Sequence, residues 1–266
     1  MRKFETAISF IQRSQIALNR DSFISDIDPR ALLISIFLFF ICLLSLPLDY
    51  PDRLIWFAVF PILLCSLSDI SYSKIFVRSL YVLPFIFLIG IFNPFLDHRV
   101  AFKAGEFDVT YGWLSFISIM VRGLLCMQAL LILIEICGFI QICNALRKLG
   151  LPKILTTQLL LLYRYIGVLL QEASDMHRAA ISRGYGKKSF PLKLWATFTG
   201  SLLIRSYERS KRLHYAMISR GFDGTIPIGK SFGWNFKDSL FIGIWGFVFI
   251  FLTFYNLTSF LMGLTR

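Results

Sequence analysis

Residues 113–140 form an almost unbroken apolar run, and this run is long enough to cross a lipid bilayer. A spanning helix needs about 20 such residues, and a backbone surrounded by hydrocarbon must satisfy its own hydrogen bonds, which favours helices. Further apolar runs occupy residues 31–48, 54–67, 80–96 and 238–261. Only 17% of the chain is charged, whereas soluble domains carry about a quarter charged residues. The sequence therefore predicts an all-α polytopic membrane protein with about five transmembrane helices.

The chain has a formal net charge of +12, and most of the excess lies in residues 141–237. That segment holds sixteen Lys and Arg against four Asp and Glu. Because cytoplasmic segments of membrane proteins are enriched in Lys and Arg, the segment is expected in the cytoplasm. Residues 97–112 carry no net positive charge and are expected on the other side. The apolar runs favour membrane and protein partners, so no nucleic-acid partner is expected.

These features divide the chain into four predicted parts. Residues 1–30 are a cytoplasmic or interfacial segment with one surface helix, and residues 31–140 are a transmembrane bundle of four helices. Residues 141–237 are a cytoplasmic domain with two long helices, and residues 238–266 hold the last transmembrane helix. This order gives five crossings, with the N-terminus inside and the C-terminus outside.

Local breaks are expected at several points. Asp28-Pro29 separates the first apolar run from the preceding segment, since proline disfavours helix at the residue before it. Residues 71–78 are expected to form a short basic connection, and Gly90 with Asn93-Pro94 interrupts the run 80–96. Residues 158–170 are strongly apolar but too few to span unaided, so they are expected to pack under the bundle, half in the interface.

A repeat links residues 176–185 with residues 213–222 at an offset of 37. Both copies place His, Ala, Ile, Ser, Arg and Gly in register, and an aromatic residue follows each Gly. Glycine favours the left-handed cap of a helix, and Arg suits the last turn. Capping alone needs only the glycine, so the matched residues also favour a docking surface. The residues concerned are Ser182, Arg183, Gly184, Ser219, Arg220 and Gly221.

The helix of the second copy has two distinct faces at 100° per residue. A charged stripe, expected to face water or a partner, comprises Arg205, Glu208, Arg209, Arg212, Ser219 and Arg220. Glu208 can pair with Arg212 one turn along. The opposite face, expected to be buried, comprises Leu203, Tyr207, Ser210, His214, Met217 and Ile218. A solvated charged face is the plain alternative to a docking surface.

Two ionisable residues, Arg122 and Glu135, lie inside the longest apolar run. Charges at that depth are costly and point to the bundle interior or to a partner. The two are about 20 Å apart along a helix axis, so they cannot pair with each other. Contacts with neighbouring helices are expected for both, rather than a transport path.

No catalytic or metal-binding set emerges from the sequence. Gly184-Tyr185-Gly186-Lys187 lacks the spacing of a phosphate-binding loop. The five cysteines lie in or beside apolar runs without metal-ligand spacing, so they are expected to act as small buried hydrophobes. The chain is therefore not expected to be an enzyme or to bind a metal.

Several stretches resemble the transmembrane T component of energy-coupling factor transporters, most closely its cobalt-type CbiQ family. The resemblance covers essentially the whole chain, and its specific part is the paired Arg-Gly motif. The family pattern usually has Ala before Arg-Gly, whereas both copies here have Ser. The matching stretches are Asp28-Pro29-Arg30, Gly90-Ile91-Phe92-Asn93-Pro94-Phe95, Ala145-Leu146-Arg147-Lys148-Leu149-Gly150-Leu151-Pro152, Tyr163-Arg164-Tyr165, Leu202-Leu203-Ile204-Arg205-Ser206-Tyr207-Glu208-Arg209 and Ala216-Met217-Ile218-Ser219-Arg220-Gly221-Phe222-Asp223-Gly224.

The resemblance implies a non-catalytic coupling subunit in the cell membrane. In such transporters two ABC-type ATPases, which carry the ATP and Mg²⁺, dock on two long cytoplasmic coupling helices. A small membrane S component captures the substrate and is toppled by movement of the T component. By resemblance, Arg183 and Arg220 each enter a groove of one ATPase, and the neighbouring Ser and Gly residues shape the helix ends. No cofactor is expected on this chain itself.

The resemblance favours cobalt or nickel as the substrate of the whole complex. A T component that serves vitamin-specific S components is the alternative. A stand-alone secondary carrier or membrane enzyme would need midplane ionisable groups on several helices or an inverted repeat. This sequence places such groups on one predicted helix, and its repeat lies in the predicted soluble part.

Overall fold

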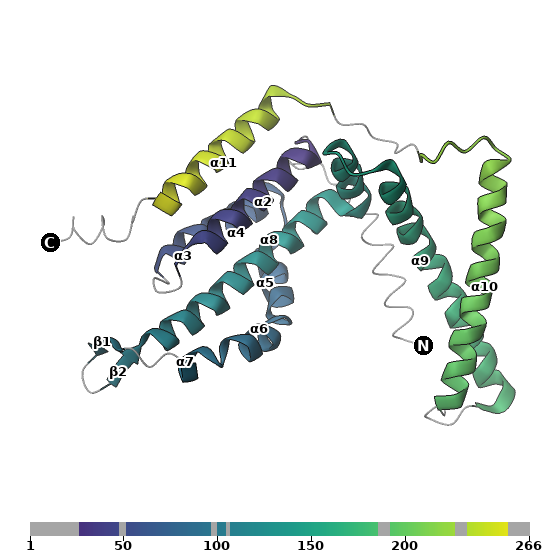
Figure 1. Cartoon of the computed structure of the whole chain (residues 1–266), viewed down its shortest axis with the longest axis horizontal. Coiled ribbons are helices and arrows are strands. Elements are labelled where there is room, and N and C mark those ends of the chain that lie inside the picture. The colour runs from purple at the N-terminus through teal and green to yellow at the C-terminus, as the bar shows by residue number, and fades with distance from the viewer. Residues whose placement is uncertain are drawn as a thin grey trace. The chain divides into compact units, whose positions relative to one another are not determined.

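The computed structural model describes residues 27–47, 52–96, 100–104, 107–185, 192–226 and 233–254 (Figure 1). Helices dominate these residues, so the predicted all-α polytopic membrane class is confirmed. Of the segment 1–30, the structure describes only residues 27–30, so the surface helix expected there lies outside the described residues. The described chain divides into two compact units. We call residues 27–138 with 233–254 the membrane unit, and residues 139–226 the hairpin unit.

The membrane unit consists of short apolar helices, the first part of one long helix and a two-stranded hairpin. Its elements are α2 (Pro29–Ser45), α3 (Asp52–Phe57), α4 (Val59–Leu67), α5 (Tyr72–Leu80), α6 (Leu83–Gly90), α7 (Asn93–Leu96), β1 (Val100–Ala104), β2 (Phe107–Thr110), the start of α8 (Tyr111–Lys148) and α11 (Phe236–Phe254). The remainder of α8 belongs to the hairpin unit, which also contains α9 (Lys153–Ala180), the π-helical turn Ile181–Tyr185 and α10 (Leu192–Ile218).

The core of the membrane unit is an aromatic cluster between α2, α3, α4 and α11. Phe39 stacks on Phe60 with ring centroids 4.9 Å apart, and Phe249 meets Phe60 edge-on at 5.0 Å. All three rings are fully buried. A side chain at Gly246 would come within 3.3 Å of Leu38, so the absence of one lets α11 approach α2 closely. In a membrane the lipid tails are as apolar as the side chains, so the hydrophobic effect does not drive helices together. Close van der Waals packing of this kind drives their association instead.

Helices α2 and α11 start at the same end of the membrane unit and run parallel (Figure 1). The N–H of Asp28 donates to Asp238 Oδ1 at 2.9 Å, and the other oxygen of Asp238 accepts the N–H of Asn235 at 2.8 Å. The Asp28 carboxylate caps α2 and holds Arg30 at 2.6 Å. The expected break before the first apolar run is thereby confirmed. Pro29 is the first residue of α2, a position whose N–H has no partner within the helix, so the lack of an N–H in proline costs nothing there.

Two connections differ from expectation. Residues 71–78 were expected to be a plain connection, but most of them belong to helix α5, whose Ile75 is buried while Lys74 and Arg78 are exposed. The polar region after α7 contains β1 and β2, which pair antiparallel, with Ala104 opposite Phe107. The predicted interruption of the run 80–96 is confirmed, because α6 ends at Gly90 and α7 begins at Asn93.

By length and composition, three described helices can cross a membrane: α8, α9 extended to Arg183, and α11. The pair formed by α5 and the helix after it is bent by 49° and can form a fourth span. Helix α2 and the stretch Arg53–Leu67 are shorter apolar helices. Residues 158–170 were expected to be too few to span unaided. The helix that contains them is longer than this apolar stretch, and by length and composition it can cross a membrane.

Helix α8 changes direction at Gly138, where the two units meet along the chain. Gly138 has φ 65° and ψ 161° inside an otherwise continuous helix. Side-chain-bearing residues essentially never adopt this region of backbone space. The glycine therefore permits the kink in α8 at the boundary between the two units.

Candidate docking site on the hairpin unit

A tight turn reverses the chain between α8 and α9. Gly150 adopts φ 109°, and the N–H of Leu151 reaches back to the carbonyl of Leu146 at 3.0 Å. Pro152 then precedes the first residue of α9. Glycine is the residue that tolerates this left-handed cap, and proline often follows because it cannot continue the helix. The turn fixes where α9 begins.

Helices α9 and α10 lie side by side as an antiparallel hairpin (Figure 1). Near one end, the Thr157 hydroxyl donates to the Gly224 carbonyl at 2.8 Å. In the middle, Glu172 of α9 lies between Arg205 at 3.6 Å and Arg209 at 3.4 Å. Because Glu172 is only 17% exposed, these ion pairs connect the helices better than a fully solvated pair would.

The second Ser-Arg-Gly copy closes α10 as the sequence predicted. Gly221 has φ 74°, and its N–H donates to the carbonyl of Ile218 at 2.9 Å. The N–H of Phe222 donates to the carbonyl of Met217 at 3.0 Å. These two bonds define a Schellman cap. Ser219 and Arg220 stay exposed, so the cap presents the arginine away from the hairpin.

Asp223 fixes the conformation of the loop that follows this cap. The hydroxyl and the N–H of Thr225 donate to Asp223 Oδ1 at 2.7 and 3.0 Å. These bonds, together with the nearby charge of Lys153, lower the pKa of the Asp223 carboxyl. The carboxylate therefore stays ionised and holds the loop in its turn.

The first copy ends its helix differently. Helix α9 runs into the π-helical turn Ile181–Tyr185, which contains Ser182, Arg183 and Gly184. Ser182 and Arg183 are exposed. The two sequence copies thus give two exposed arginines on two differently wound helix ends.

The antiparallel hairpin places Arg183 and Arg220 at opposite ends. Arg183 follows the end of α9, beside the start of α10, whereas Arg220 follows the end of α10. Helix α10 has 27 residues, which corresponds to about 40 Å at 1.5 Å per residue. The two arginines therefore cannot enter the same small pocket.

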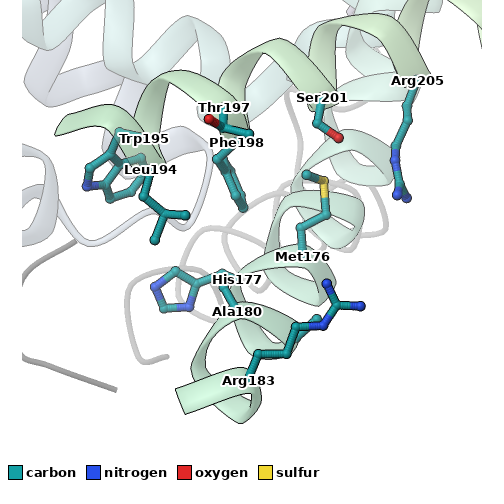
Figure 2. A pocket seen from close by; sticks show the side chains of 11 residues that line it. Met176, His177, Ala180, Arg183, Leu194, Trp195, Thr197, Phe198, Ser201 and Arg205 are labelled. Carbon is teal, nitrogen blue, oxygen red and sulfur yellow. The ribbon is translucent and has the colours of Figure 1, made fainter. Parts of the chain in front are cut away.

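A pocket of about 370 Å³ lies beside Arg183 (Figure 2). Met176 and His177 approach it from α9, and Trp195 and Phe198 approach it from α10. The aromatic pair at positions i and i+3 of α10 was not singled out from the sequence, although that spacing places both rings on one face. Arg183 therefore stands at the rim of an apolar recess instead of on a bare helix end.

The predicted burial of α10 is wrong. Leu203 is 69% and Tyr207 is 59% exposed, and α10 has no buried residue. The side of the charged stripe that holds Arg205 and Arg209 instead turns toward Glu172. The expected pair of Glu208 with Arg212 is present at 4.0 Å. A helical wheel gives the angle between faces but not which face a neighbouring helix covers.

Arg122 and Glu135 have separate partners, as expected. Arg122 Nη2 donates to the carbonyls of Leu46 and Pro47 at 2.8 and 2.7 Å, where α2 ends. Cations favour the negative end of a helix dipole. Glu135 pairs with Arg78 of α5 at 2.8 Å. Both residues therefore join α8 to neighbouring helices.

Comparisons with known proteins agree with this architecture. The family model described as "Cobalt transport protein", CbiQ, matches residues 20–229. The energy-coupling factor transporter transmembrane protein EcfT of Bacillus subtilis is 30% identical over 219 residues, which cover 76% of this chain and 82% of that protein. An uncharacterised protein of Methanocaldococcus jannaschii is 26% identical over 215 residues, 76% of this chain and 72% of its own length.

A shorter match involves a putative fused cobalt transport protein, CbiMQ, of Methanocorpusculum labreanum. It is 32% identical over 91 residues, which cover 34% of this chain and 15% of that protein. The family match spans both units described above and includes the two arginine motifs. The chain therefore belongs to the CbiQ family of cobalt transport proteins, the family of transmembrane T components of energy-coupling factor transporters.

Proposed function

We propose that this chain is the coupling subunit of an ATP-driven importer, which transmits movement of two ABC-type ATPases to a small substrate-binding S component. The observation that carries the proposal is the pair of exposed arginines at opposite ends of one helical hairpin. A dimeric ATPase offers two equivalent grooves, and two arginine side chains must be well separated if each is to enter one of them. The hairpin provides that separation.

The docking residues in this proposal are Ser182, Arg183 and Gly184 at one end and Ser219, Arg220 and Gly221 at the other. The arginine guanidinium is permanently charged and offers a planar fork of donors, which suits a carboxylate or backbone carbonyls inside a groove. The small Ser and Gly neighbours leave room for the walls of the groove. The chain itself is non-catalytic, and ATP and Mg²⁺ belong to the ATPases.

Cobalt or nickel is the substrate that we propose for the whole complex. The description of the matching family and the name of the fused relative both support cobalt. The EcfT relative supports the more general T-component role, so service to a vitamin-specific S component is the second candidate. Neither proposal requires a substrate site on this chain.

We place the hairpin unit on the cytoplasmic face of the cell membrane. Its Lys and Arg excess supports this side. Because α2 and α11 start together, an even number of crossings must separate their first residues. We assign one crossing each to α2, the α3–α4 stretch, the bent α5–α7 segment and α8, which makes four. Two of them, α2 and Arg53–Leu67, are shorter apolar helices. Helix α9 therefore does not cross alone, although its length and composition would allow it.

This orientation predicts the labelling pattern of single cysteines in a variant without its native cysteines. Thr110→Cys should react with a membrane-impermeant maleimide in intact cells, because β2 ends on the outer side. Arg178→Cys should react only after the membrane is permeabilised. Equal labelling of both positions in intact cells would rule out the proposed orientation.

Co-expression tests the function directly. The chain should co-purify with a pair of ABC-type ATPases and one S component, and the complex should take up cobalt or nickel in proteoliposomes only when ATP is supplied. Uptake by this chain alone, without ATPase, would instead favour a secondary carrier. Uptake of a vitamin but not of the metals would select the second candidate substrate class.

A further inference from the structure

The turn between α8 and α9, residues 147–155, combines exposed apolar side chains with cations. Ile154 is 70% and Leu155 is 52% exposed, and Leu149 is also exposed. Lys148 and Lys153 are exposed, and Arg147 is half-buried, with one guanidinium nitrogen 3.3 Å from the neutral Asn144 oxygen. The cation-rich and apolar surfaces thus belong to the same turn.

Acidic residues are missing from the surrounding sequence. Between Glu135 and Glu172 the chain has no Asp or Glu, but it has Arg147, Lys148, Lys153 and Arg164. Arg164 lies over the ring of Tyr165, 6.0 Å from its centroid. Among the described residues, the charge of Lys153 also acts on the carboxylate of Asp223. The sequence segment that contains the turn, residues 136–171, therefore carries a net positive charge.

The membrane is within reach of this turn because α8 leads directly into it. The apolar run that spans the bilayer ends near Ile140, and Arg147 follows seven residues later, at most about 10 Å away along the helix. That distance is close to the Debye length at physiological salt. Anionic lipids of the cytoplasmic leaflet attract cations placed there.

We propose that residues 147–155 form a binding surface for anionic phospholipids of the cytoplasmic leaflet. Arg147, Lys148 and Lys153 bind the phosphate headgroups, and Leu149, Ile154 and Leu155 enter the boundary of the acyl chains. Amphipathic segments with cations beside large apolar side chains lie in the interface in this way. Such an anchor covers the apolar start of α9, which does not cross the membrane by itself. The proposal rests on the cytoplasmic orientation proposed above but not on ATPase docking.

Native mass spectrometry of the full chain in detergent tests the proposal. The chain is titrated separately with phosphatidylglycerol and with phosphatidylcholine. The triple variant R147Q/K148Q/K153Q should bind phosphatidylglycerol about 100-fold more weakly, since each juxtamembrane cation contributes roughly fivefold. The matched control R178Q/K211Q/R212Q removes three exposed cations elsewhere on the hairpin and should stay close to the unaltered chain.

The unaltered chain supplies the second measurement, which needs no variant to fold. Its preference for phosphatidylglycerol over phosphatidylcholine should fall steeply between 0.1 and 1 M NaCl, because the Debye length shrinks from about 10 to about 3 Å. Equal binding of the two lipids at low salt would overturn the proposal. Full competition by soluble glycerol phosphate would also overturn it, because it would indicate a site for free phosphate. Loss of the ATPases by the triple variant with unchanged lipid binding would overturn it too, because it would indicate a protein interface. Loss of ATPases by an Arg183 and Arg220 variant that still binds lipid would separate this anchor from the docking function.

Discussion

Replacing Arg183 and Arg220 together by glutamate should abolish co-purification of the ATPase pair. If each arginine fills a groove of one ATPase, truncating it alone costs on the order of 2–5 kcal/mol, and charge reversal should cost at least as much. The double variant should still insert and fold, because both side chains are exposed and the ion pairs that join α9 to α10 are made by Glu172 with Arg205 and Arg209. The measurement is pull-down of the ATPases and ATP-dependent uptake, with expression checked for each variant.

The control for this experiment follows from the ion pairs. Arg212→Glu reverses a charge that is exposed on the same helix and pairs only loosely with Glu208, so it should cost about 1 kcal/mol at most. Arg209 is a poor control, because a glutamate there would face Glu172 and weaken the hairpin itself. Normal ATPase binding by the Arg183 and Arg220 double variant would leave both motifs as ordinary helix ends.

Replacing Gly138 by alanine should cut uptake by about tenfold or more while the ATPases still co-purify. Alanine at φ 65° and ψ 161° is strained by about 1–3 kcal/mol, and each 1.4 kcal/mol is worth a factor of ten in an equilibrium. The strain is relieved if residue 138 becomes helical, which removes the kink in α8. The hairpin and both arginines stay intact, so docking survives while transmission between the two units suffers.

Gly200→Ala is the matched control. Gly200 lies within α10 at an ordinary helical position, and a side chain there would meet no atom within 4 Å. Alanine should raise helix stability there by up to about 1 kcal/mol and leave uptake unchanged. A Gly138→Ala variant with normal uptake would show that the backbone at this kink has no role in coupling.

The sequence determined those features that depend on local chemistry. Apolar runs of bilayer length led to the all-α membrane class, since a backbone in lipid has few alternatives. Asp28-Pro29 gave the start of α2, and Gly90 with Asn93 gave the break after α6. The cap at Gly221 was predictable for the same reason: its bonds lie within six consecutive residues. The repeat also identified Arg183 and Arg220 as a pair before any helix was placed.

Only the tertiary structure decided how these elements face one another. The sequence separation of 37 residues does not say whether two arginines lie at one end or at two, and the antiparallel path of α10 along α9 settles that they lie at two. A wheel for α10 assigned Leu203 and Tyr207 to a buried face, but α9 contacts the helix through Arg205 and Arg209 instead. The partner of Arg122, two carbonyls at the end of α2, is likewise remote in sequence. Sequence periodicity determines the angles between side chains around one helix. Burial and pairing depend on which segments, remote in sequence, pack against that helix.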